Sequence, residues 1–322
     1  MKQRTFENSH KQQWEVLETW LDSLEKRNSE VQNIAEFPQR YRQVCQHLAL
    51  ARDRHYTPHL IERLNRLVLR GHQQLYTTPS RLIGKMIEFI SFDFPQMVRD
   101  ESRFVILSSL LFFGSLLIMF FGVQVNPDLI YSLMDVKQVE GIEKMYNPVA
   151  EHLGYNREAK SDFLMFGFYI RHNITIDFQT FAGGIFFGLG SLFFLIFNGL
   201  YIGSIAGHLT HIGYGVPFYS FVAGHSAPEL MAIVLSGATG LKLGFALIAP
   251  GRFSRLQALH HAATRSIVII YGVIAMSLLA AFLEAFWSSN SAIEPSIKYT
   301  VGCLLWFFVI TYFIKMGRNR GH

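Results

Sequence analysis

The first hundred residues carry apolar side chains at helical spacing within a polar background. Four apolar residues recur every three or four positions in the stretch WEVLETWLDSL: Trp14, Leu17, Leu21 and Leu24. Four leucines repeat the spacing in LIERLNRLVLRGHQQLY: Leu60, Leu64, Leu67 and Leu75. Because this spacing puts side chains on one face of a helix, the pattern predicts a cytoplasmic helical domain over residues 1–98.

Long apolar runs dominate the rest of the chain, residues 99–322. Four runs are each close to the roughly 20 residues that cross the hydrocarbon of a bilayer: residues 104–123, 181–207, 266–287 and 299–314. The sequence therefore predicts an all-α, polytopic membrane domain with about five or six membrane segments. The stretch SDFLMFGFYIRHN, before the second run, is amphipathic, and we expect it at the membrane interface.

Residues 208–250 admit two interpretations. The loop at residues 251–265 has three arginines and no acid, and the tail IKMGRNRGH is also basic, so both should be cytoplasmic. If the chain is also inside at residue 208, one crossing cannot return it to the inside, and we expect a re-entrant pair or a short crossing at 209–224 before a longer one. The alternative is a plain five-span bundle, which places Arg252 and Arg255 outside.

Small residues recur at four-residue spacing through the second half of the chain. They are Gly184, Gly188, Gly199, Gly203, Gly207, Ser236, Gly240 and Gly244. Such spacing lets helix backbones approach closely in lipid. The pattern predicts tight helix packing, either within one chain or between copies in a homo-oligomer.

Composition supports the membrane assignment. Of the 322 residues, 50% are hydrophobic and 16% are charged, a balance that excludes most soluble domains. The formal charge of +5 is explained by arginines beside apolar runs, so we expect no nucleic-acid partner. In residues 124–178 acids outnumber bases, which predicts an acidic external segment. Two cysteines, Cys45 and Cys303, suggest no disulfide framework, and the first residues show no cleaved signal peptide.

The stretch GHSAPELMAIVLSGATG contains the main candidate site. Glu229 is an acid near the start of an apolar helix, and acids at membrane depth are costly and mark sites or partners. The pattern Ser226-x-x-Glu229, with proline in the first turn, equally fits a capping box that satisfies free backbone N–H groups. His225 precedes Glu229 by four residues, but a cap at Ser226 would separate the two side chains.

Other polar residues in apolar runs are weaker candidates. His208, His211 and His225 offer zinc-type ligands, but a lone H-x-x-H is a weak signal, so we expect no metal and no cofactor. Glu284 is a second intramembrane acid beside an aromatic anchor, and Asn198 and Gly199 fit interhelical contacts. The chain carries no recognisable catalytic motif, so we expect no enzyme.

Several blocks of the chain resemble the stage II sporulation protein M family of multi-pass bacterial membrane proteins. The soluble part is similar at YRQVCQHLALARDR and LNRLVLRGHQQLY. The membrane part is similar at RHNITIDFQTFAGGIFFGLGSLFFLIFNGLYIG and GHSAPELMAIVLSGATGLKLGFALIAPGR. This chain departs from the family pattern at Ser226, where the family usually has glycine, and at Pro228.

The resemblance implies a multi-pass bacterial membrane protein, which we expect in the inner membrane. The charge bias predicts that both of its termini are cytoplasmic. The resemblance also implies a non-enzymatic scaffold that acts with envelope-remodelling partners, as founding members of the family act with peptidoglycan-degrading proteins. The alternative from the residues themselves is a transporter, channel or lipid-moving permease built around a re-entrant helix start near His225–Glu229. The expected partners are the lipid bilayer, a second copy of the chain and envelope proteins.

Overall fold

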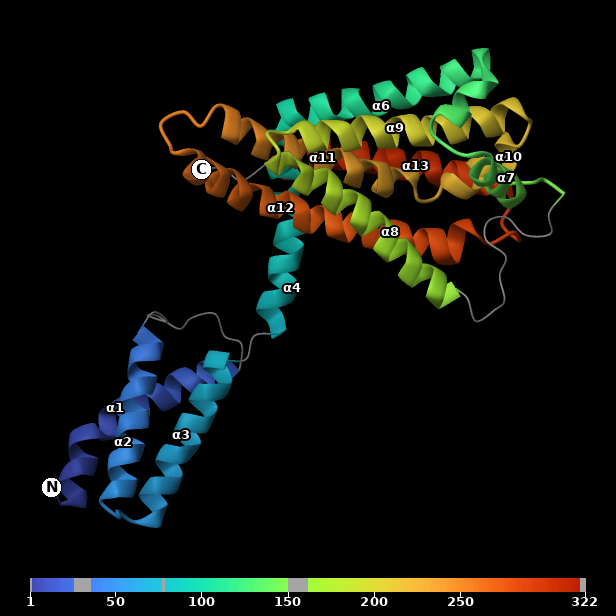
Figure 1. Ribbon diagram of the computed structural model, residues 1–322. Coiled ribbons are helices and arrows are strands. Elements are labelled where there is room, and N and C mark those ends of the chain that lie inside the picture. The colour runs from blue at the N-terminus through green and yellow to red at the C-terminus, as the bar shows by residue number, and fades with distance from the viewer. Residues whose placement is uncertain (1, 26–35, 77–78, 150–161, 319–322) are drawn as a thin grey trace. The chain divides into compact units, whose positions relative to one another are not determined.

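The structure is a computed structural model that describes residues 2–25, 36–76, 79–149 and 162–318. These residues form helices and loops without strands, which confirms the all-α prediction. Contacts divide the chain into two compact units, Met1–Lys85 and Met86–His322, and each is described by itself (Figure 1).

The first unit is built on three helices that share one apolar core. These are α1 (Gln3–Glu25), α2 (Phe37–Asp53) and α3 (Pro58–Tyr76). The two predicted stripes meet in this core, whose largest buried side chains include Trp14, Leu17, Leu21, Leu64 and Leu67. At the surface, the Arg70 guanidinium of α3 binds the carboxylates of Asp22 and Glu25 on α1. The helical spacing read from the sequence thus corresponds to a packed helical unit.

The second unit is a helix bundle with short helical connections. Its elements are α4 (Pro79–Glu88), which spans the division between the units, η2 (Phe89–Asp93), α5 (Phe94–Asp100), α6 (Ser102–Val125), η3 (Pro127–Ser132), α7 (Val136–Met145), α8 (Asp162–Ala182), η4 (Gly183–Ile185), α9 (Leu189–His211), α10 (Gly215–Val222), α11 (Ser226–Ile248), α12 (Arg255–Phe282), η5 (Leu283–Ser288) and α13 (Pro295–Lys315). Within the described residues, five helices are long and apolar enough to cross a membrane: α6, α9, α11, α12 with η5, and α13.

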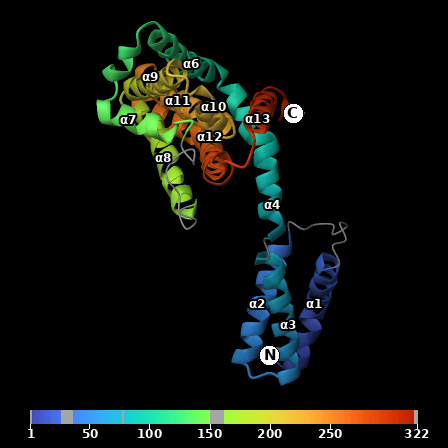
Figure 2. The ribbon, with the colours of Figure 1, turned by 90° about the vertical axis from the view of Figure 1, so that its right-hand side faces the viewer.

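Helix α11 is the central helix of the bundle (Figures 1 and 2). Of its apolar window, 61% is buried, against 22–39% for the other four spanning candidates. A helix buried on most of its surface can place polar groups away from lipid, whereas its neighbours cannot do so on their outer faces. This position explains why the residues of α11 dominate the candidate site.

One end of the bundle, here called the basic end, gathers the start of α6 and the ends of α11 and α13. The Lys242 ammonium of α11 lies 2.6 Å from a carboxylate oxygen of Glu101, just before α6. Arg99 donates to the carbonyl of Phe313, at the end of α13, over 3.1 Å. The start of α12 lies here too, because Arg265 is 3.8 Å from Glu101.

The opposite end, here called the acidic end, gathers η3, α7, α10, η5 and the start of α11. The side chain of Gln124, at the end of α6, donates to the carbonyl of Gly207 in α9. His208 lies 2.7 Å from a carboxylate oxygen of Glu143 in α7. The Tyr299 hydroxyl, near the start of α13, donates to the carbonyl of Val216 in α10. Successive long helices therefore run between these two ends in alternating directions.

Helix α8 also runs from the acidic end to the basic end, although its charged residues keep it out of the set of apolar candidates. Near its start, Phe163 packs edge-on against Phe286 of η5. At its end, the carbonyl of Thr180 accepts a hydrogen bond from Ser191, at the start of α9. Residues 162–178 thus lie along the bundle, whereas the sequence assigned them to an external or interfacial segment. The predicted run 181–207 is correspondingly broken by η4, and α9 begins at Leu189.

The extra passage along α8 changes the expected course of residues 208–250. His208 and Arg252 lie at opposite ends of the bundle, so the expectation that both are inside is wrong. Helix α10 has eight residues, about 12 Å of rise, and stays at the acidic end, while α11 alone makes the passage. The helix does break near Ala223–His225 as expected, but no re-entrant pair is needed. The five apolar candidates agree with the five-span alternative in number. That alternative placed Arg252 and Arg255 outside, whereas the additional passage along α8 puts them at the same end of the bundle as Arg99.

Small residues set the close approach of α6, α9, η4 and α11. A Cβ at Gly199 or Gly203 would overlap the backbone of α6, and one at Gly207 would lie 2.9 Å from the carbonyl oxygen of Phe120. A Cβ at Gly184 in η4 would overlap the backbone of Gly240 in α11, and one at Gly240 would overlap the Ser191 hydroxyl of α9. Gly188 lies against Gly244 at the turn before α9. These contacts are between segments of one chain.

The division between the units falls earlier than residue 98. Phe94 and Val98 belong to the same apolar cluster as Ile269, Val273 and Phe313. A Cβ at Gly272 would strike the Phe94 ring, so α5 packs directly on α12. The segment that leads into the first span is therefore part of the bundle.

Candidate functional site

The start of α11 differs from the predicted capping box. His225 is the residue before the helix, and neither its side chain nor that of Ser226 caps it. The backbone N–H of Glu229 bonds to the carbonyl of His225, so Ser226 lies inside the first turn. The Ser226 hydroxyl instead accepts a hydrogen bond from the Trp306 indole over 3.0 Å. The capping interpretation of Ser226 is therefore wrong.

Three ionisable side chains meet at this helix start, here called the His–Glu cluster: His225, Glu229 and Glu284. One possible ligand atom from each lies within 4.8 Å of the others. The His225 imidazole is 4% exposed and its Nε2 lies 3.6 Å from a Glu229 carboxylate oxygen. Glu284 comes from η5, a π-helical turn, and such turns are frequent at functional sites. Two residues four apart and a third more than fifty residues away thus share one site.

Neighbouring groups hold the His225 ring in place. Its Nδ1 lies 2.9 Å from the Ser288 hydroxyl, which is fully buried. The backbone carbonyl of Ser288 accepts a hydrogen bond of 2.7 Å from the ammonium of Lys298, whose side chain is almost completely buried. The Trp287 ring covers Gly224, where any Cβ would overlap it. The cluster is therefore fixed by packing and by hydrogen bonds from η5 and α13.

A second polar position lies deeper in the bundle. Asp177 of α8 is 5% exposed, and one of its carboxylate oxygens accepts a hydrogen bond from the Ser277 hydroxyl of α12. Ser236 of α11 lies beside it, two turns after Glu229 and so about 10 Å further along the helix axis. Asp177 therefore continues the line of acids from the His–Glu cluster toward the basic end.

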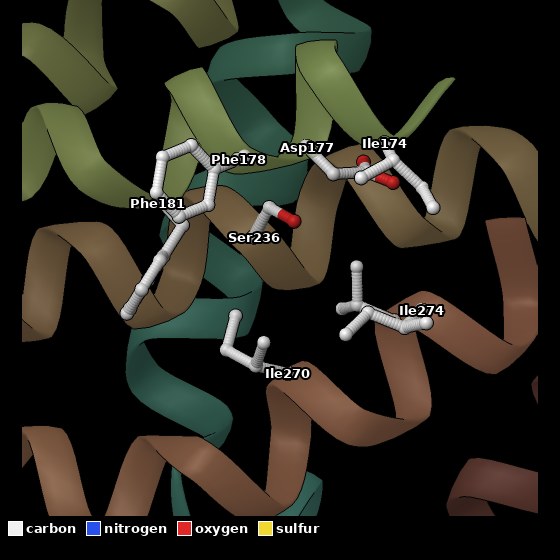
Figure 3. Close-up of a pocket in the computed structure, with 8 residues that line it drawn as sticks. Ile174, Asp177, Phe178, Phe181, Ser236, Ile270 and Ile274 are labelled. Carbon is white, nitrogen blue, oxygen red and sulfur yellow. The ribbon is translucent and has the colours of Figure 1, made fainter. Parts of the chain in front are cut away.

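A narrow crevice leads to Asp177. It is formed by α8, α11 and α12 and has a volume of about 60 Å³. Figure 3 shows Asp177 and Ser236 on one side of it, with Ile270 and Ile274 of α12 on the other. The remaining lining side chains are also apolar: Ile174, Phe178, Phe181 and Val273. The crevice is thus apolar and lies beside a carboxylate that apolar groups surround.

Asn173 lies one turn before Asp177 and is also buried. Its side-chain nitrogen and oxygen have no hydrogen-bond partner among the described residues, and the same holds for one oxygen of Asp177. Buried polar atoms without partners are costly, and in natural proteins they call for an explanation such as water, an ion or function. Asp177 is not singled out by the sequence pattern, because residues 124–178 read as an external or interfacial segment.

The other predicted residues lie elsewhere. Asn198 donates to the carbonyl of Phe194 within α9, and Gly199 faces α6. His208 pairs with Glu143, and His211 is exposed. Within the described residues, the grouping suited to a metal ion contains His225 but neither of these histidines. The sequence candidates for zinc are thus separated, whereas His225, Glu229 and Glu284 are brought together.

Two family models together match most of the chain. Residues 108–289 match the family model for stage II sporulation protein M, and residues 4–77 match a domain of unknown function, DUF8413. No curated protein and no solved structure matches the chain. The matched region includes the whole His–Glu cluster and the Asp177 crevice. Because this match spans more than half of its length, the chain belongs to the stage II sporulation protein M family.

Proposed function

We propose that this membrane protein moves protons or small cations through its helix bundle. The observation that carries the proposal is the line of ionisable side chains inside the bundle, from the His–Glu cluster at the acidic end to Asp177 on α8. Ionisable groups at membrane depth are expensive and commonly mark ion pathways or proton relays. The small residues already supply the helix contacts, so packing alone does not call for these acids.

The charge at the two ends supports an orientation for this activity. Arg99, Arg252, Arg255, Arg265 and Lys315 lie at the basic end. Asp128, Asp135, Glu140 and Glu143 lie at the acidic end. Positive residues beside membrane segments favour the cytoplasmic side. We therefore place both termini in the cytoplasm of a bacterium, the acidic end outside, and the bundle in the inner membrane.

Proton flux in vesicles tests the proposal. The full chain is reconstituted into liposomes with a pH-sensitive dye inside, and a potassium gradient with valinomycin supplies the driving force. We expect flux above that of empty liposomes, a loss of at least tenfold in Asp177→Asn, and normal flux in the matched control Asp128→Asn at the acidic end. In the same vesicles, sodium and potassium gradients test whether the protein moves these cations. Flux equal to that of empty liposomes for all three ions would refute the proposal.

A second candidate function is a scaffold for envelope remodelling. It is favoured by the separately packed unit of α1–α3, whose surface carries charged groups, and by η3 and α7 at the acidic end of the bundle, which present charged side chains of both signs. Both give a membrane protein surfaces for partners, and the packing residues allow a homo-oligomer. Copurification from mild detergent tests this candidate. Isolation as a monomer with no stoichiometric partner would argue against it.

A further inference from the structure

We propose that His225, Glu229 and Glu284 form a binding site for a divalent transition-metal ion of the zinc class. The inference does not depend on transport, because a resident metal ion can serve structure or activity. Its basis is the convergence of one imidazole and two carboxylates, with one possible ligand atom from each within 4.8 Å of the others.

The distance between His225 and Glu229 fits a shared metal ion better than a direct hydrogen bond. His225 Nε2 and the nearer Glu229 oxygen are 3.6 Å apart, beyond the usual limit of about 3.2 Å for an N–H···O bond. Two ligands on one tetrahedral zinc ion, with bonds of about 2.1 Å, lie about 3.4 Å apart. A shift of a few tenths of an ångström would therefore let both side chains bind the same ion.

The imidazole is oriented as a metal ligand. Its Nδ1 contacts the Ser288 hydroxyl at 2.9 Å, and the His225 side chain is 4% exposed. When the far nitrogen of a ligating histidine donates to an oxygen, the ring is fixed and the other nitrogen keeps its lone pair for the metal. Here that other nitrogen, Nε2, points toward Glu229. Ser288 thus supplies the second contact that metal-bound histidines use.

The ligand set selects the class of ion. Nitrogen and carboxylate oxygen suit zinc and its neighbours in the first transition series, whereas calcium and magnesium prefer oxygen alone. Three protein ligands leave a fourth position for water. The elements that hold these ligands are close-packed, because Trp287 covers Gly224 beside His225.

The local charge balance sets a competition between a metal ion and a proton. The Lys298 ammonium binds the carbonyl of Ser288, whose hydroxyl contacts His225, and so supplies one positive charge to this part of the bundle. With both carboxylates ionised and His225 neutral, one negative charge remains unbalanced in a medium of low dielectric constant. A bound divalent ion would change the net charge of the site to one positive charge. The partial positive charge at the N-terminus of α11 disfavours that state. A single proton is therefore the direct competitor of the metal ion.

Metal content of the purified full chain tests the inference. The protein in mild detergent is stripped with a chelator, loaded with Zn²⁺, desalted and measured by mass spectrometry. We expect one tightly held ion per chain, and a drop in affinity of at least a hundredfold in His225→Gln and Glu284→Gln. Ser288→Ala should weaken binding by about tenfold. The matched controls His208→Gln and Glu143→Gln, from the other histidine–carboxylate pair, should bind as the wild type does.

Two further measurements separate a lost site from a lost fold. Zn²⁺ should raise the melting temperature of the wild type, while the stripped His225→Gln and stripped wild-type proteins should melt alike. Co²⁺ should give visible absorption bands in the wild type that disappear in His225→Gln. Equal Zn²⁺ content in the wild type, His225→Gln and Glu284→Gln would overturn the inference, and so would a proton-only site without bound metal. Zinc binding without ion flux refutes transport alone, and flux without zinc binding refutes the metal site alone.

Discussion

The Nε2 atom of His225 lies 3.6 Å from a carboxylate oxygen of Glu229, one helical turn further along the chain. The two side chains meet because α11 begins at Ser226, so His225 occupies the position that precedes the first turn. Four-residue spacing then brings the histidine and the acid to the same face. The sequence suggested a cap from the three-residue spacing of Ser226 and Glu229, whereas the structure pairs Glu229 with His225, four residues before it.

Ser226 should act through Trp306 rather than as a helix cap. We expect Ser226→Ala to lower the free energy of unfolding by about 1 kcal/mol, the usual net contribution of one hydrogen bond. Trp306→Phe removes the same bond, so the two changes should be non-additive in a double-mutant cycle measured by thermal unfolding in detergent. Strict additivity would mean that Ser226 stabilises the start of α11 independently of Trp306.

The ion pair between Lys242 and Glu101 should couple α11 to the start of α6. Both side chains are about nine-tenths buried, at 12% and 11% exposure, and the charged atoms are 2.6 Å apart. Breaking a buried pair typically costs about 3–5 kcal/mol, and Arg265, 3.8 Å from Glu101, should offset part of that cost. We therefore expect Lys242→Met to lower the melting temperature strongly and the double variant with Glu101→Gln to recover part of the loss. A single variant that melts like the wild type would contradict this.

Gly203 should be far less tolerant of a side chain than Gly114. A Cβ at Gly203 in α9 would overlap the carbonyl group of Leu116 in α6, whereas a Cβ at Gly114 meets no atom within 4 Å. Overpacking of this kind typically costs about 1–3 kcal/mol. We expect Gly203→Ala to lower the melting temperature and Gly114→Ala to leave it unchanged or slightly raised. Equal effects would show that α6 and α9 are not in contact at this position.

Acid should weaken the first unit through His47. The Trp14 indole donates to Nδ1 of this buried ring, and burial together with nearby His10 lowers the pKa of His47 from 6.5 to about 4. As the pH falls, His47 therefore binds a proton in the unfolded chain before it does so in the folded chain. Stability should be constant above pH 6.5, fall between pH 6.5 and 4, and level off below, with a total loss on the order of 3 kcal/mol.

Denaturant unfolding followed by tryptophan fluorescence measures this loss. Trp287 and Trp306 are replaced by phenylalanine, so that the signal comes from Trp14 and Trp20 in the first unit. His47→Gln should remove most of the pH dependence, because its amide oxygen can still accept from Trp14. The control His59→Gln, at an exposed position, should retain the pH dependence of stability. A midpoint that stays constant from pH 7 to 4 in the wild type would be inconsistent with this role for His47.

The sequence predicted much of the fold because its patterns are local. Leucine spacing identified the helices of the first unit, and apolar runs identified α6, α9, α12 and α13. Helix α8 was missed as a passage because Asp177, Arg171 and Asp162 lower its hydropathy. In the structure Asp177 is buried against Ser277, so the charge that argued against a membrane segment is shielded by neighbouring helices. That shielding depends on contacts between distant segments, which a hydropathy pattern does not contain.

The candidate site was predicted in its residues but not in its arrangement. Glu229 and Glu284 were selected as costly acids in apolar surroundings, and His225 as a zinc-type ligand four residues before Glu229. Their convergence depends on the π-helical turn η5, which faces the start of α11, and no local signal places two elements beside each other. Lys298 was overlooked because a lysine near a helix start reads as exposed, whereas here it is buried against Ser288.

We propose that α8 crosses the membrane together with the five apolar helices, which would put Asp177 in the bilayer and set the direction of every later helix. Site-specific labelling tests it most directly, with Ser132→Cys after α6 and Phe186→Cys after α8, each in a chain whose Cys45 and Cys303 are replaced. A membrane-impermeant maleimide should label position 132 in intact cells and position 186 only in opened membranes. Labelling of both positions from the same side would contradict the account.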